Sequence, residues 1–171
     1  MKVLKEGTAP WVSEAIAEVY ALDLCVGHPN ICQLLDVTMR DMPNRVALVF
    51  EEWGEDLRQS MHRVEKRPEQ VREILLHVTR GLAHLHTVGL IHCDLKPANI
   101  LIKEASGPRE ASGRHEAWSR KLACEVADLE CCVAAASEHR PAEPVIQKQT
   151  LNYRAPEILF GCPDFAAEVF N

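Results

Sequence analysis

The stretch that decides the prediction is Ile91-His92-Cys93-Asp94-Leu95-Lys96-Pro97-Ala98-Asn99-Ile100-Leu101. It places Asp94, Lys96 and Asn99 close together, with apolar residues on both sides. The flanking runs, Leu90–Asp94 and Asn99–Ile102, are typical of short extended segments. The pattern therefore predicts a polar loop held between two short strands.

A long helix is expected immediately before this loop. Pro68-Glu69 places a proline and an acid in a first helical turn, which is a common start signal. Apolar residues then recur at steps of three and four from Val71 to Leu85. Gly89 supplies a C-terminal stop.

The first fifty residues predict a smaller unit of helix and sheet. Lys2–Lys5 is typical of the end of a strand, and the apolar spacing of Val12–Leu24 predicts an amphipathic helix. Ile31–Val37 and Arg45–Phe50 are strand-like, with a turn at Met42-Pro43-Asn44 between them.

Composition bounds the class of protein. The chain has 171 residues, of which 47% are hydrophobic and 26% charged, so it is globular and of ordinary domain size. A net charge of −6 argues against nucleic acid as the main partner. Neither a run of 18 apolar residues nor a signal-peptide core is present, so no membrane span is expected. Seven irregularly spaced cysteines, with Cys131 and Cys132 adjacent, favour reduced thiols in a cytoplasmic or nuclear protein over disulfides or zinc.

The 91–101 stretch resembles the catalytic loop of protein kinases, in which Asp, Lys and Asn occur in this order and spacing. The resemblance implies that Asp94 accepts the proton of the substrate hydroxyl and that Lys96 is a cation beside the transferring phosphate. It implies that Asn99 is a magnesium ligand. A chance polar turn is disfavoured, because each position matches in type and order.

Upstream segments resemble the same family in the same order. Lys2 corresponds to the strand lysine that grips the nucleotide phosphates, and Glu18 to the helix glutamate that pairs with it. His28-Pro29-Asn30-Ile31 is similar to the turn that follows that helix. Lys2 and Glu18 are therefore expected to form the nucleotide-gripping pair.

Two regions of this resemblance would complete the nucleotide site. Leu48–Trp53 resembles the strand and hinge at which adenine binds, through the Glu51 carbonyl and the Trp53 backbone. Asp128-Leu129-Glu130 stands where a magnesium-binding Asp-Phe-Gly is usual, which makes Asp128 a second magnesium ligand. Thr150–Glu157 resembles the end of the activation segment. The resemblance covers nearly the whole chain except Gly107–Arg120.

The subgroup and substrate class follow from smaller details of the resemblance. Tyr153–Leu159 is similar to the group that contains cyclin-dependent, mitogen-activated and dual-specificity tyrosine-regulated kinases. Cys93, between His92 and Asp94, is similar to the last of these. Lys96, two residues after Asp94, implies serine/threonine specificity.

The implied fold is α+β, a partial two-lobed protein kinase fold that is truncated at both ends. Residues 1–50 would be a reduced β-rich N-lobe without its Gly-rich loop, and residues 51–57 the hinge. Residues 58–171 would be an incomplete helical C-lobe with an insert at about 104–121.

The implied function is transfer of the ATP γ-phosphate to Ser or Thr hydroxyls, with ATP and Mg²⁺ as cofactors. A protein substrate and a regulatory protein partner are expected, and neither nucleic acid nor a membrane. Two alternatives stay open: a catalytically inactive pseudokinase or interaction module, and an incomplete gene product.

Glu130 is the main departure from the family pattern within the site. It replaces a glycine, and a residue with a β-carbon resists positive φ. Its carboxylate could repel nucleotide phosphate, or it could add a metal ligand beside Asp128. The third alternative is that this position adopts a conformation that glutamate tolerates.

Overall fold

The computed structural model describes residues 2–3, 10–39, 46–52, 54–64, 68–104, 122–134 and 150–154. Within these residues the α+β class is confirmed, because helices alternate with small antiparallel sheets. The helices are α1 (Pro10–Leu24), α2 (Leu57–Val64) and α3 (Pro68–Thr87). The strands are β1 (Lys2–Val3), β2 (Leu34–Met39), β3 (Val46–Phe50), β4 (Glu55–Asp56), β5 (Leu90–Ile91), β6 (Ile100–Glu104), β7 (Leu122–Val126) and β8 (Val133–Ala134).

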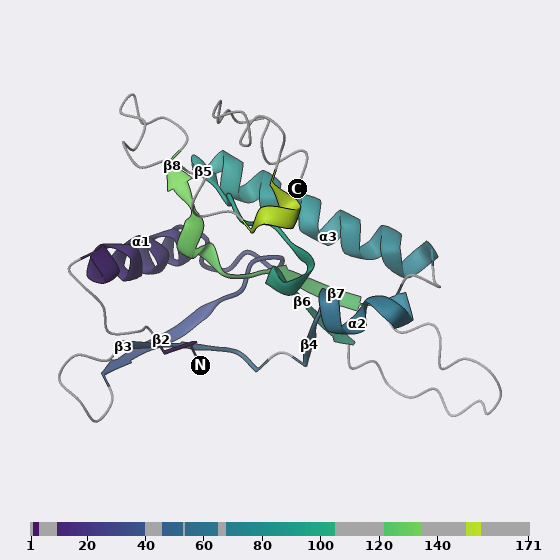
Figure 1. The fold of residues 1–171 in the computed structure, drawn as a ribbon, viewed down its shortest axis with the longest axis horizontal. Helices are drawn as coiled ribbons and strands as arrows, with labels where there is room; N and C mark the ends of the chain where they lie inside the picture. The colour runs from purple at the N-terminus through teal and green to yellow at the C-terminus, as the bar shows by residue number, and fades with distance from the viewer. Residues whose placement is uncertain are drawn as a thin grey trace.

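The N-terminal unit consists of α1 and the antiparallel sheet β1–β3–β2 (Figure 1). The predicted helix at 12–24 is confirmed, and it begins two residues earlier at Pro10. The strand predicted at Ile31–Val37 was wrong in its first half, because β2 begins at Leu34. Ile31 instead forms an isolated parallel bridge with Val126, and the Cys32 N–H donates to the Val126 carbonyl at 2.9 Å. These two backbone contacts connect the N-terminal unit to β7.

The second unit packs α2 and α3 against the sheet β4–β6–β7. The long helix is confirmed as α3, and Gly89 follows it with a φ of 79°, as its role as a stop requires. The predicted apolar face of α3 is split by the packing. Ile74, Val78 and Leu85 are buried, whereas Leu75 is 60% exposed.

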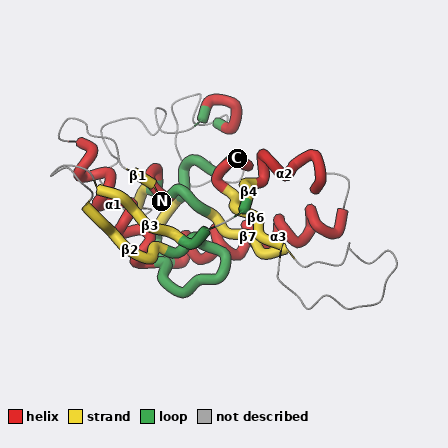
Figure 2. Tube along the Cα trace, turned by 90° about the horizontal axis from the view of Figure 1, so that it is seen from below, coloured by secondary structure: helices red, strands yellow, loops and turns green. Residues whose placement is uncertain are grey.

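Among the described residues, two hydrophobic clusters form the core, and α3 contributes to both. Ile74 and Val78 pack in a cluster with β6 and β7, while Leu85 packs in a second cluster with α1 and β3. Half-buried Leu82 contacts both clusters. Seen from below, α1 and the first sheet lie at one end of the molecule, with α2 and the β4–β6–β7 sheet at the other (Figure 2). The segments between the two ends carry the candidate site.

Some expectations fall outside the described residues: the turn at Met42–Asn44, the hinge residue Trp53, most of the 104–121 insert and the segment after Arg154. Among the helices that the structure describes, none is long and apolar enough to cross a membrane. No disulfide joins the six described cysteines.

Candidate nucleotide and phosphoryl-transfer site

The loop between β5 and β6 is held by its own side chains. His92 is fully buried; its Nδ1 accepts the Asp94 N–H at 3.2 Å and its Nε2 bonds the Ala127 carbonyl at 3.1 Å. The Asn99 amide donates to the Asp94 carbonyl at 2.9 Å. A single 3₁₀ turn, Pro97–Asn99, then leads into β6. The local spacing therefore brings Asp94, Lys96 and Asn99 together, as the loop pattern predicts.

The Asp94 carboxylate is buried and ion-paired. Lys96 Nζ lies against its Oδ2, while the Thr150 N–H and hydroxyl both donate to Oδ1, at 2.9 and 2.8 Å. Burial alone would raise the pKa of Asp94, but the hydrogen bonds from Lys96 and Thr150 outweigh it and lower the pKa. Asp94 is therefore ionised at neutral pH, the state that a proton acceptor needs.

The sequence did not predict that Thr150 contacts the Asp94–Lys96 pair. Lys96 Nζ donates to its hydroxyl at 2.8 Å, so Thr150 contacts both members of the Asp94–Lys96 pair. It lies 56 residues after Asp94, and no spacing rule connects the two. The only available signal was its place at the start of the Thr150–Glu157 segment.

A second cluster forms around the Lys2 ammonium on β1. Lys2 Nζ contacts both carboxylate oxygens of Glu18 on α1, at 2.9 and 3.1 Å, and Oδ1 of Asp128 at 2.7 Å. Burial alone would lower the pKa of Lys2, but the hydrogen bonds that Lys2 donates to Asp128, Glu130 and Glu18 raise it well above its usual value. The structure thus brings together three residues that span 126 positions of the chain.

Glu130 joins this cluster, with Oε2 2.9 Å from Lys2 Nζ. It lies in the 3₁₀ turn Leu129–Cys131, while the left-handed conformation falls on Asp128, with a φ of 64°. The left-handed conformation therefore lies two residues before Glu130, at a residue type that tolerates it better than most. Cys93, in the Asp94 loop, has the same φ of 64°. Strained backbone of this kind is concentrated at functional sites.

Ala127 connects the two clusters. Its N–H donates to the Asn99 carbonyl at 2.9 Å, and its carbonyl accepts from buried His92. Asp128, the next residue, is thereby placed beside the Asp94 loop. Asn99 uses its amide nitrogen on Asp94, so its amide oxygen is the atom that it can offer to a cation.

The residues present fit a magnesium ion only in part. Among the described His, Cys, Asp and Glu side chains, no group of three is arranged to hold a metal ion. Mg²⁺ is commonly held by one or two protein oxygens together with substrate phosphates. Asn99 and Asp128 suit that arrangement, in which the nucleotide supplies the remaining ligands.

The structure describes only part of the predicted hinge. Glu51 follows β3 and is exposed, and Trp53 lies outside the described residues. Glu125 on β7, which interacts electrostatically with Glu51, is 9% exposed. Burial raises the pKa of Glu125 to about 7; the charge of Glu51 adds to this rise and Lys103 opposes it.

Glu125 should make the protein less stable as the pH rises. Its carboxyl has a folded pKa of about 7 against an ordinary value of 4.5, so the unfolded chain loses its proton first. The stabilising contribution is complete below about pH 4.5 and is lost as the pH rises through 7. We expect Glu125→Gln to be more stable than the wild type by about 1–3 kcal/mol at pH 8, and by little at pH 5. Urea unfolding at both pH values measures this.

Glu52→Gln, at an exposed neighbouring carboxylate, is the control, and its stability should differ little from the wild type at either pH. A Glu125→Gln effect of equal size at pH 5 and pH 8 would contradict the assignment.

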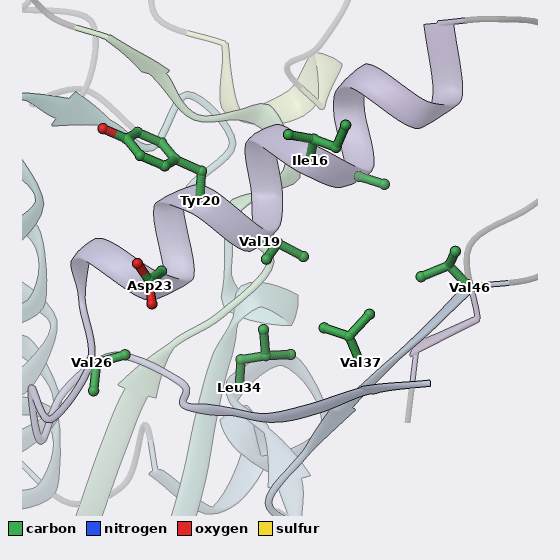
Figure 3. A pocket seen from close by; sticks show the side chains of 9 residues that line it. Ile16, Val19, Tyr20, Asp23, Val26, Leu34, Val37 and Val46 are labelled. Carbon is green, nitrogen blue, oxygen red and sulfur yellow. The ribbon is translucent and has the colours of Figure 1, made fainter. Parts of the chain in front are cut away.

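An open apolar groove of about 540 Å³ lies between α1 and strands β2 and β3 (Figure 3). Ile16 and Tyr20 on its helical wall are 63% and 61% exposed, and Leu34 lies on its strand wall. None of the predicted site residues that the structure describes lines this groove. It is therefore separate from the candidate nucleotide site.

A lysine–glutamate pair joins β1 to α1, and an Asp-Lys-Asn loop lies between β5 and β6. Together with this fold, they define a protein kinase domain. The model of the protein kinase domain family matches residues 1–169, and the chain belongs to that family.

Individual relatives point to the cyclin-dependent group within it. The chain is 29% identical to serine/threonine-protein kinase ssn3 of Aspergillus niger, over 92% of its own length and 34% of the relative. It is 27% identical to a probable cyclin-dependent kinase 10 of Dictyostelium discoideum, over 84% of the chain and 35% of the relative. It is 26% identical to human cyclin-dependent kinase 11B, over 83% of the chain and 16% of the relative. The chain thus spans about a third of the length of the first two relatives, and the predicted resemblance to cyclin-dependent kinases is confirmed.

Proposed function

We propose that this chain is a nucleotide-binding and catalytic part of a protein serine/threonine kinase, which transfers the γ-phosphate of ATP to Ser or Thr hydroxyls. The observation that carries the proposal is the contact of Lys2 with Glu18 and Asp128, beside a loop that holds Asp94 ionised. These contacts join residues that are far apart in the sequence, and they support a role in phosphoryl transfer.

Each residue has a stated role in this proposal. Asp94 accepts the proton of the acceptor hydroxyl, and Lys96 neutralises charge on the transferring phosphate. Asn99 and Asp128 hold Mg²⁺, which when bound offsets the charge of the phosphates. Lys2, positioned by Glu18, binds the phosphates, and the backbone at Glu51 and Trp53 binds adenine.

The remaining parts of the proposal concern the surroundings of the site. We assign residues 1–50 to an N-lobe, 51–57 to a hinge and 58–171 to a C-lobe with an insert at about 104–121. The substrate is a protein, and a regulatory protein partner completes the active form. A cytoplasmic or nuclear location suits cysteines that form no disulfide among the described residues.

A second candidate function is a pseudokinase that binds partners without turnover. It is favoured by one observation, the Glu130 carboxylate on Lys2, where a nucleotide phosphate would bind. Nucleotide binding and phosphate transfer, measured separately, distinguish it from the catalytic proposal.

Mg-ATP should stabilise the chain, and Asp128→Asn should remove that effect. Ligand at ten times its Kd adds about 1.4 kcal/mol, which corresponds to a rise of about 3–6 °C in the unfolding midpoint. Asp128→Asn loses the carboxylate that holds Mg²⁺, while Lys2 keeps its pairing with Glu18. Thermal unfolding with and without Mg-ATP measures both.

The matched control is Asp36→Asn, an exposed aspartate on β2, which should keep the full shift. The proposal fails if Mg-ATP leaves the wild-type midpoint unchanged, or if Asp128→Asn shifts as the wild type does.

A further inference from the structure

The Lys2 ammonium has no hydrogen-bond donor left for a ligand. A lysine ammonium carries three N–H donors. Glu18, Asp128 and Glu130 each place a carboxylate oxygen within 2.9 Å of Nζ. A nucleotide phosphate can therefore reach Lys2 only if one of these three carboxylates leaves.

The three carboxylates differ in how easily each can leave. The Glu18 side chain is 1% exposed, and its release would leave an unpaired charge in the interior. Asp128 is held on a strained left-handed backbone, and our proposed function assigns it to Mg²⁺. Of the two partly exposed acids, Glu130 has the longer side chain, which is 44% exposed. Glu130 is the carboxylate that can move into water at least cost.

We infer that Glu130 is an internal competitor for the nucleotide: its carboxylate occupies the phosphate-binding position at Lys2 and must be displaced when the nucleotide binds. The inference rests on the proposed function and adds to it a residue that determines phosphate affinity. The sequence left open whether Glu130 repels nucleotide phosphate or adds a metal ligand. Contact with Lys2 supports exclusion of phosphate over an additional metal ligand.

The expected effect is moderate, because exposed ion pairs are weak and are screened by salt. Glu130→Gln removes the competing contact and the repulsion of an anionic ligand. We expect it to lower the Kd of Mg-ATP by roughly three- to tenfold at low salt. The Kd of adenosine, which has no phosphate, should not change.

The experiment is titration calorimetry on the full chain with Mg-ATP and with adenosine. Glu130→Asp keeps the charge but withdraws the carboxylate by one methylene, so it should give a gain in Mg-ATP affinity smaller than that of Glu130→Gln. Asp23→Asn, an exposed charge change on the groove side of α1, is the matched control and should leave the Mg-ATP Kd within twofold.

Each outcome separates the two proposals. If adenosine binds but Glu130→Gln leaves the Mg-ATP Kd unchanged, the inference is overturned and the proposed function stands. A weaker Mg-ATP affinity in Glu130→Gln would make Glu130 a metal ligand and also overturn it. If Glu130→Asp binds Mg-ATP with the wild-type Kd, the contact between Glu130 and Lys2 is not what weakens nucleotide binding, and the inference is overturned. If no variant binds Mg-ATP or adenosine, both the proposed function and the inference fail.

Discussion

Asp94→Asn should abolish most phosphate transfer while nucleotide binding persists. The Asp94 carboxylate is the group that we propose to take the proton of the acceptor hydroxyl, and an amide cannot do so. Loss of a general base typically lowers the rate by about 10²–10⁴-fold. Transfer of labelled γ-phosphate from ATP to a library of Ser- and Thr-containing peptides measures the rate, and calorimetry measures the Kd.

The substitution also has a structural cost, which has to be separated from the chemical one. Lys96 and both donors of Thr150 point at this carboxylate, so an amide NH₂ would face donors instead of accepting from them. The unfolding midpoint of each variant is therefore compared at the assay temperature. Asp36→Asn, at an exposed position of β2, should keep the wild-type rate. Undiminished transfer by a folded Asp94→Asn variant would remove Asp94 from the mechanism, and binding without transfer in the wild type would favour the pseudokinase.

Gly81→Ala should destabilise the fold, although alanine is the better helix former. Gly81 lies in α3, where it is buried against the turn before β2. A β-carbon at this position would lie 2.6 Å from the Asn30 carbonyl oxygen and 3.1 Å from Cγ2 of Val126. The helix propensity gained is about 1 kcal/mol, and overpacking of a rigid contact usually costs more. We expect a net loss of about 1–3 kcal/mol in the free energy of unfolding.

The contact cannot relax easily, because Asn30 is held on both sides. Its carbonyl accepts the Val126 N–H at 2.9 Å, and its side-chain amide donates to the Cys124 carbonyl at 3.0 Å. Urea unfolding measures the loss. Thr79→Ala, at an exposed position of the same helix, should change stability by less than about 0.5 kcal/mol. A stabilised Gly81→Ala variant would show that the turn at Asn30 can retreat from the helix.

The features that could be predicted from the sequence are those that depend on near neighbours. The 3.6-residue period of α3 and the stop at Gly89 are local properties, so their positions were predicted well. Helix α2 was not predicted, and the first half of the 31–37 strand was wrong. Ile31 pairs with Val126, a strand partner that lies far along the chain and leaves no mark on the local pattern.

The grouping of Asp94, Lys96 and Asn99 could be read from the sequence, because these residues lie within six positions of one loop. The resemblance to protein kinases added the pairing of Lys2 with Glu18. Only the tertiary structure placed Thr150 on Asp94 and Glu130 on Lys2, across 56 and 128 residues. Such contacts depend on the path of the chain between the two residues, and the physical reason is that packing and backbone hydrogen bonds set that path.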